Sequence, residues 1–109
     1  MGDHLKIIRE SILTTLDEDG LKPASIFLFG SRARKKHSEL SDYDLLVIVK
    51  DELDPHTKRK VRRKIYNKLH DTLPVVSFDI IVKTEKEFRT EKEVVNTISN
   101  EALLEGIRI

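Results

Sequence analysis

The sequence predicts a mixed α/β (α+β) fold, in which a small mixed sheet of three to four strands is covered by about three helices. Three short apolar runs bounded by turn residues, at 25–29, 42–49 and 75–82, are typical of buried strands. Amphipathic helical patterns lie before the first run, between the second and third, and after the third. A chain of 109 residues is expected to form a single domain spanning residues 1–109 and to bury roughly 65% of its unfolded surface.

The composition excludes several classes of protein. The formal net charge is only +1, which does not indicate a generally basic nucleic-acid binder. Cysteine is absent, so disulfides and thiolate metal sites are excluded. The first residues do not form a signal peptide, and no apolar run reaches membrane-spanning length. We therefore expect a cytoplasmic protein without membrane association.

The N-terminal segment is predicted to be a helix that packs on the sheet. Asp3 is placed to cap it, and Gly20 is placed to end it. Its apolar stripe has helical spacing and consists of Leu5, Ile8, Ile12 and Leu16. The following strand, residues 25–29, does not alternate between apolar and polar residues, which predicts burial on both faces.

A turn at Gly30 and Ser31 follows the first strand. Ser31 is expected to cap a short helix that runs to residue 34 or 35, and residues 37–41 are expected to form a loop. The second strand, 42–49, begins with Asp42 and Asp44. Because side chains alternate along a strand, these two aspartates are predicted to share one face.

A second long helix is predicted over residues 56–72, and one of its faces is strongly basic. The basic residues are Lys58, Arg59, Lys60, Arg62, Arg63, Lys64 and Lys68. This face fits nucleic acid or an acidic partner, but a solvated outer face is the favoured explanation. Apart from Tyr66, the helix lacks aromatic side chains on which bases could stack.

The third strand, 75–82, contains one acidic residue, Asp79, in an otherwise apolar run. An ionised carboxylate inside a sheet is costly unless it is paired or binds a metal. A third helix is predicted over about 91–104, and residues 107–109 are expected to add a short edge strand. The inner side of this third helix is expected to consist of Val94, Val95, Ile98 and Ala102.

The three aspartates are candidate metal ligands. The Cα atoms of Asp42 and Asp44 should lie about 6.6 Å apart on a strand, where two like charges repel by roughly 2.5 kcal/mol at an effective dielectric of about 20. A divalent cation offsets this repulsion, and carboxylate oxygens select Mg²⁺ or Mn²⁺. Asp79 on a neighbouring strand can complete the cluster, bind a second metal, or accept a proton from an incoming hydroxyl.

A purely structural interpretation of the first two aspartates remains open. Asp42 can cap the turn before the second strand, and Asp44 can pair with Arg32 or Arg34. Capping does not explain an aspartate within the third strand, so Asp79 favours the metal site.

The Gly30–Ser31 turn is a candidate phosphate site. Glycine allows a backbone to approach a ligand closely, and the start of a helix favours phosphate. Positive charge follows at once, from Arg32, Arg34, Lys35 and Lys36. The alternative is an ordinary strand-to-helix turn.

Together these residues resemble a known family. The string G-S-R-A-R, six residues, then S-D-Y-D-L-L-V resembles the signature of the polymerase-β-type nucleotidyltransferase superfamily, and in particular its smallest branch, the minimal nucleotidyltransferase (MNT) domains. Asp79 falls where that family's third carboxylate is expected. One departure is Lys35, where many members carry glycine.

The resemblance implies a polymerase-β-like fold and two-metal nucleotidyl transfer. Gly30, Ser31 and Arg34 would hold the nucleotide, with ATP as the substrate. Asp42 and Asp44 would bind two Mg²⁺ ions, and Asp79 would bind one of them and help to activate the acceptor hydroxyl. The hydroxyl attacks the α-phosphate, and pyrophosphate leaves.

The resemblance also implies a partner. Members of this kind are often encoded beside a HEPN-type ribonuclease toxin and act as its antitoxin, and some transfer AMP onto a toxin tyrosine. The three strands and three helices leave no residues for a separate acceptor domain, so we expect another chain to present the acceptor, in a homo- or hetero-oligomer. The alternatives are an antitoxin that acts by contact alone, a nucleic-acid binder that uses residues 56–72, and transfer to a small molecule.

Overall fold

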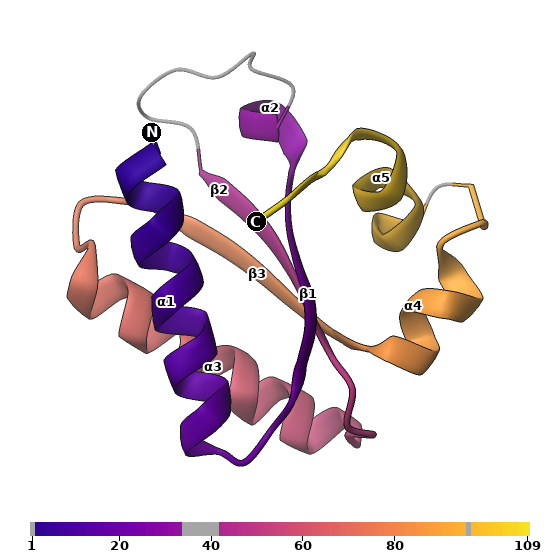
Figure 1. Ribbon diagram of the computed structural model, residues 1–109, viewed down its shortest axis with the longest axis horizontal. Helices are drawn as coiled ribbons and strands as arrows, with labels where there is room; N and C mark the ends of the chain where they lie inside the picture. The colour runs from indigo at the N-terminus through magenta and orange to yellow at the C-terminus, as the bar shows by residue number, and fades with distance from the viewer. Residues whose placement is uncertain (1, 34–41, 96) are drawn as a thin grey trace.

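The computed structural model describes residues 2–33, 42–95 and 97–109, in which helices and strands alternate as far as β3 and two helices then follow in succession (Figure 1). In chain order the elements are α1 (Gly2–Glu18), β1 (Pro23–Phe29), α2 (Gly30–Ala33), β2 (Tyr43–Val49), α3 (Pro55–Thr72), β3 (Phe78–Thr84), α4 (Glu85–Glu91), α5 (Ile98–Glu105) and β4 (Ile107–Arg108). None of these helices is long and apolar enough to cross a lipid bilayer.

The strands form one mixed sheet in the order β3-β2-β1-β4. β1 pairs with β2 and with β4 in antiparallel fashion, whereas β2 and β3 are parallel. A parallel pair needs a long crossover between its strands, and α3 supplies it. The prediction of a mixed sheet with a short edge strand at the C-terminal end is confirmed.

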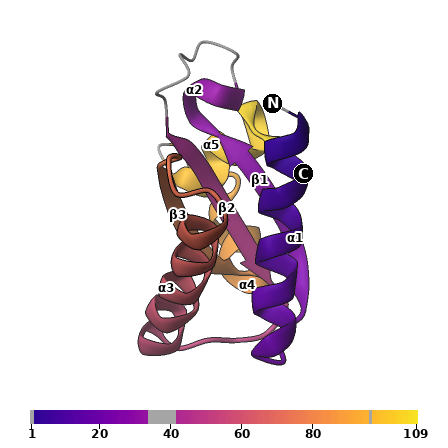
Figure 2. The same cartoon turned by 90° about the vertical axis from the view of Figure 1, so that its left-hand side faces the viewer.

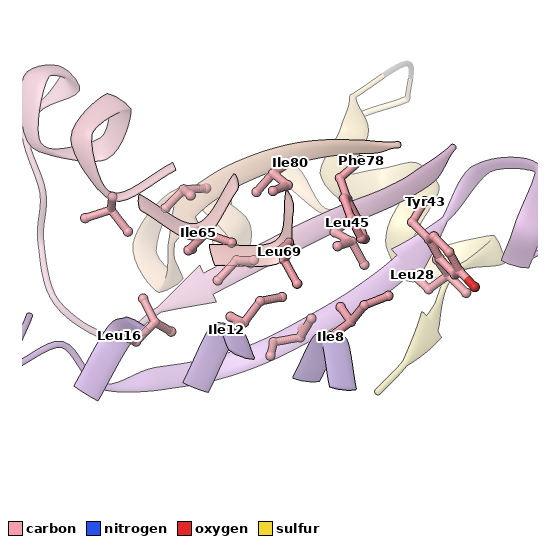
Figure 3. Packing of buried hydrophobic residues seen from close by; sticks show 14 of the residues in the cluster. Ile8, Ile12, Leu16, Leu28, Tyr43, Leu45, Ile65, Leu69, Phe78 and Ile80 are labelled. Atoms are coloured by element: carbon pink, nitrogen blue, oxygen red, sulfur yellow. The ribbon is translucent and has the colours of Figure 1, made fainter. Parts of the chain in front are cut away.

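Helices α1 and α3 cover one face of the sheet (Figure 2). The larger hydrophobic cluster lies between them and the strands, and Figure 3 shows its central side chains. It includes Ile8, Ile12 and Leu16 of α1, Val61, Ile65 and Leu69 of α3, and Tyr43, Leu45, Val47 and Val49 of β2. The helical spacing that predicted α1 and α3 therefore marks their buried faces.

The opposite face of the sheet is covered by α4 and α5, over a smaller cluster of buried residues, Phe29, Leu46, Ile48 and Ala102. At its rim the rings of Phe27 and Phe88 stack with their centroids 5.7 Å apart. Cover on both faces explains why β1 and β2 read as continuous apolar runs rather than alternating ones.

The prediction of one helix over 91–104 is wrong, because two shorter helices occupy residues 85–105. The Thr84 side chain accepts from the Glu87 N–H to cap α4, and Thr97 accepts from the Asn100 N–H to cap α5. Between them the chain turns, so Val94 and Val95 are 52% and 74% exposed instead of lining an inner face.

Several element boundaries also differ from expectation. α1 already begins at Gly2, so Asp3 is not its cap. α3 begins one residue early, at Pro55, because the Asp54 carboxylate accepts from the Thr57 N–H at 2.7 Å, which lowers the pKa of Asp54. β3 begins at Phe78 rather than 75, leaving Val75 96% exposed. The predicted loop at 37–41 lies outside the described residues.

Candidate active site

The predicted site residues that the structure describes, Gly30, Ser31, Asp42, Asp44 and Asp79, lie at one end of the sheet, where β1 ends and β2 and β3 begin (Figure 1). Because β1 runs antiparallel to β2, and β2 runs parallel to β3, these three strand ends meet at the same edge. The turn after β1 and the acidic residues of β2 and β3 are therefore brought together from distant parts of the sequence.

Asp44 and Asp79 are direct neighbours across the parallel pair, since the register aligns Asp44 with Asp79. Adjacent strands lie about 4.8 Å apart. The residues on either side of both aspartates point into the larger core: Tyr43 and Leu45 in β2, Phe78 and Ile80 in β3. Strand alternation then places both carboxylates on the other face, toward the side of α4 and α5.

Asp42 lies immediately before β2 and is exposed. Continuing the alternation back from Tyr43 places it on the same side as Asp44. The Tyr43 N–H donates to the Ser77 carbonyl at 3.0 Å, which ties the start of β2 to the segment that leads into β3. All three aspartates therefore lie at one end and toward one face of the sheet.

Gly30 lies directly against the Asp44 carboxylate. Its φ is +73°, in the left-handed region, and a Cβ built on it would collide with Oδ2 of Asp44. Two independent requirements, one of backbone conformation and one of space, therefore select glycine at the end of β1. The turn and Asp44 are therefore in contact.

Arg32 lies away from solvent and against an aromatic ring. Its side chain is only 7% exposed, and its Cζ lies 3.9 Å from the ring centroid of Tyr43. A guanidinium over a tyrosine face is a stabilising cation–π contact. The expected contribution of Arg32 to a positive surface beside the turn is therefore corrected: it joins α2 to the start of β2.

Tyr43, between the two aspartates, was missed as a site residue by the sequence argument. It is 1% exposed, its ring stacks on Phe78 at 5.8 Å between centroids, and its hydroxyl is hydrogen bonded to His4 Nδ1 at 3.1 Å. The signal was available, because a residue between two strand-face aspartates must point to the opposite face and into the core.

The environment of Asp79 differs from the expectation. The sequence placed it in mid-strand, where a carboxylate would be costly, but it is the second residue of β3 and is exposed. Because Asp79 is exposed, desolvation does not require its carboxylate to be paired or to bind a metal. Its position opposite Asp44 is what connects it to the site.

The carboxylates do not form a finished metal cage. In the described part of the chain, no group of three or more Asp, Glu or His side chains is arranged to hold a metal ion on its own. Mg²⁺, however, is usually bound by one or two carboxylates together with substrate phosphates and water. The aligned pair of Asp44 and Asp79, with Asp42 beside it, fits that requirement.

Of the two other predicted nucleotide-binding residues, Ser31 and Arg34, only Ser31 lies among the described residues. The backbone of Ser31 belongs to α2, directly after Gly30. Arg34, together with Lys35 and Lys36, lies outside the described residues.

Comparison with known proteins decides the family. The sequence model of the nucleotidyltransferase domain family matches residues 9–104. The chain belongs to this family. Membership confirms the predicted fold class and the prediction of a nucleotidyltransferase. No curated protein matches the chain significantly in a sequence comparison.

Solved structures with a similar fold come from toxin–antitoxin complexes. A chain from a complex with AMP-PNP has a TM-score of 0.61 at 22% identity, and the match covers 91% of this nucleotidyltransferase domain and 69% of that chain. A tri-AMPylated Shewanella oneidensis HEPN toxin in complex with MNT antitoxin gives a TM-score of 0.55 at 19% identity, covering 94% and 69%. The predicted resemblance to MNT proteins is therefore supported at the level of the fold, which this chain shares with chains of these complexes.

A third similar structure is a mutant of an MntA–toxin complex, in which two aspartates two positions apart are replaced by glutamate. Its TM-score is 0.59 at 19% identity, and the match covers 91% of this chain and 69% of that one. At this level of identity the likeness is one of fold.

Proposed function

We propose that this nucleotidyltransferase transfers AMP from ATP to a hydroxyl group, that of a tyrosine, on a HEPN-type toxin, and that it acts as the antitoxin of that toxin. The observation that carries the proposal is the register that aligns Asp44 with Asp79, with Gly30 packed against the Asp44 carboxylate. We place the activity in the cytoplasm, where its substrate ATP is made and used.

Each residue has a defined task in this reaction. Gly30 and Ser31 hold the triphosphate, and Arg34 adds positive charge to it. Asp42, Asp44 and Asp79 would hold two Mg²⁺ ions, which would neutralise the phosphate oxygens and stabilise the charge that develops on them. An Asp79 oxygen takes the proton of the acceptor hydroxyl as its oxygen bonds to the α-phosphorus. The bond between the α-phosphorus and the bridging oxygen breaks, and pyrophosphate leaves.

The solved structures support this choice of substrate and partner. One similar complex contains AMP-PNP, an ATP analogue, and another contains a HEPN toxin that carries AMP. The aspartates altered in a third have the same spacing as Asp42 and Asp44. The proposal extends these properties to the present chain.

The test is transfer of label from ATP to a co-purified HEPN-type partner in the presence of Mg²⁺. We expect label from α-³²P-ATP and none from γ-³²P-ATP, because pyrophosphate is the leaving group. Asp44→Asn should abolish labelling, since it removes a charge from the centre of the aligned pair. Asp17→Asn is the matched control, because Asp17 is an exposed aspartate on α1 with no part in the site.

Two results would contradict the proposal. Undiminished labelling by the Asp44→Asn protein would separate the reaction from the aspartate pair. Neutralisation of the toxin without any label, by a protein that binds ATP, would show that the chain acts by contact alone.

A further inference from the structure

A groove of about 400 Å³ runs between α3 and the outer edge of the sheet. Its floor and inner wall come from three consecutive residues of β3, Ile80, Ile81 and Val82. Its outer wall comes from the first turns of α3, namely Pro55, Lys58, Arg59 and Arg62. None of the three aspartates lines it, so the groove is separate from the proposed active site.

The inner wall of the groove is an open strand edge. β3 is the terminal strand of the sheet, and in the described part of the chain it pairs only with β2 (Figure 1). Every second residue of such a strand directs its N–H and C=O groups away from the sheet, where they can pair with an added strand. At seven residues, β3 is long enough to hold a strand of five or six residues.

The outer wall of the groove is positively charged and incompletely paired. Lys58 forms an ion pair with Glu87 at 2.8 Å. Arg59 and Arg62 are exposed, and within the described residues neither forms a salt bridge. The charge of Arg59 acts on the Asp54 carboxylate only at longer range, where it helps to lower the pKa of Asp54. Two guanidinium groups, suited to bidentate contact with carboxylates, therefore face a ligand-sized space.

We propose that this groove binds an extended acidic segment of a partner protein, which adds a strand to the edge of β3. Main-chain hydrogen bonds to β3 would supply affinity independent of sequence. Because side chains of the added strand alternate between the faces of the sheet, acidic residues at every second position would all point toward Arg59 and Arg62. The inference does not depend on the proposed nucleotidyl transfer.

The charges and shape of the groove argue against two other occupants. A second copy of this chain, paired edge to edge through β3, would bring two basic α3 helices together, and like charges repel. A nucleic acid would find phosphate-binding cations on the outer wall, but the inner wall is aliphatic and, among the described residues, no aromatic side chain lines the groove for its bases to stack on. A phosphate backbone also cannot provide the alternating donors and acceptors that an open strand edge requires.

The test uses the full chain and a fluorescent ten-residue peptide of alternating Glu and Val, with both ends blocked. Fluorescence anisotropy should show saturable binding that weakens at least about tenfold in the double variant Arg59→Gln, Arg62→Gln. The matched control is Lys60→Gln, Arg63→Gln, which removes two exposed charges from the same helix outside the groove and should leave the affinity unchanged.

Two further probes separate strand addition from simple charge attraction. A peptide with all of its backbone amides N-methylated keeps every charge but cannot donate hydrogen bonds to β3 in either strand direction, so its binding should be lost. Equal binding of this peptide, or equal effects of the two double variants, would overturn the proposal. Binding of a ten-nucleotide oligothymidine that depends on Arg59 and Arg62, and exceeds that of the acidic peptide, would instead assign the groove to nucleic acid.

Discussion

At the scale of single residues, the two glycines with left-handed backbones separate two kinds of constraint. Gly20 has a φ of +69° and open space where a Cβ would stand. Gly30 has a nearly identical φ of +73°, but its Cβ position is filled by the Asp44 carboxylate. Gly20 is thus required by conformation alone, and Gly30 also by its contact with the site.

Substitution of each glycine by alanine should reveal this difference. Gly20→Ala should lower the free energy of unfolding by about 1–2 kcal/mol, the cost of a left-handed alanine. Gly30→Ala should cost more and should also reduce labelling of the partner, because Asp44 must move to admit the methyl group. Urea unfolding and the labelling assay measure the two effects. Equal losses of stability in both variants would contradict this account of Gly30.

Tyr43 makes three distinct contacts, and two substitutions resolve them. Tyr43→Phe removes only the hydrogen bond to His4 and should cost about 0.5–1.5 kcal/mol. Tyr43→Leu also removes the ring that stacks on Phe78 and lies under Arg32, and should cost about 2 kcal/mol more. Thermal unfolding checks the order. If the two variants are equally stable, the ring contacts contribute nothing measurable.

At the scale of elements, the start of α4 is fixed by a capping box whose acidic member is also tied to α3. The Glu87 carboxylate accepts from the Thr84 N–H at 3.0 Å and from Lys58 Nζ at 2.8 Å. Partial burial disfavours the charged form of Glu87, but these hydrogen bonds outweigh it, so the pKa of Glu87 is lowered. The carboxylate therefore stabilises the fold when it is ionised.

This lowered pKa gives a signed prediction for pH. The contribution of the Glu87 charge is complete above the ordinary pKa of about 4.5 and is lost as the pH falls through the lower folded value. Glu87→Gln keeps an acceptor for Thr84 but removes the charge, so it should destabilise the protein by about 0.5–1 kcal/mol at pH 7. The difference should shrink toward pH 3. A constant difference from pH 7 to pH 3, in urea unfolding, would show that the charge is irrelevant.

The elements that the sequence predicted well are those whose periodicity arises from burial against a large surface. The stripe of Ile8, Ile12 and Leu16 marks α1 because all three side chains are fully buried. The division between α4 and α5 was missed because both helices begin after a threonine N-cap, Thr84 and Thr97. Threonine is also enriched in strands, so it does not by itself mark the start of a helix. Val75 was assigned to β3 by its apolar character alone.

The candidate site was predictable in part for the same reason. Alternation along β2 follows directly from sequence, so the shared side of Asp42 and Asp44 could be expected. The alignment of Asp44 with Asp79 depends on the register of a parallel pair, which no local pattern encodes. The burial of Arg32 over Tyr43 depends on packing between α2 and β2, which is likewise a tertiary property.

At the scale of the whole molecule, the two faces of the sheet are unequally supported. The cluster under α1 and α3 is extensive, whereas that under α4 and α5 contains few buried residues. Regions with little buried apolar surface open at lower free energy than the rest of a domain. We expect amides of α4 and α5 to exchange with solvent well before those of β2, α1 and α3.

Native-state hydrogen exchange in increasing denaturant measures this order directly. Amides of α4 and α5 should report a small opening free energy that depends weakly on denaturant, and amides of β2 should report global unfolding. Merging of all these amides into one cooperative unit would show that the smaller cluster is as firmly bound as the larger one.

The parallel pairing of β2 with β3 also has a consequence for how the protein is made. Asp44 gains its neighbour only after the whole of α3 and the start of β3 have been synthesised and have folded back onto the sheet. A nascent chain that has left the ribosome only as far as α3 carries the glycine turn and the first two aspartates, but not Asp79. Under the proposed mechanism, the site is therefore complete only after the edge strand β3 has been synthesised and has docked against β2.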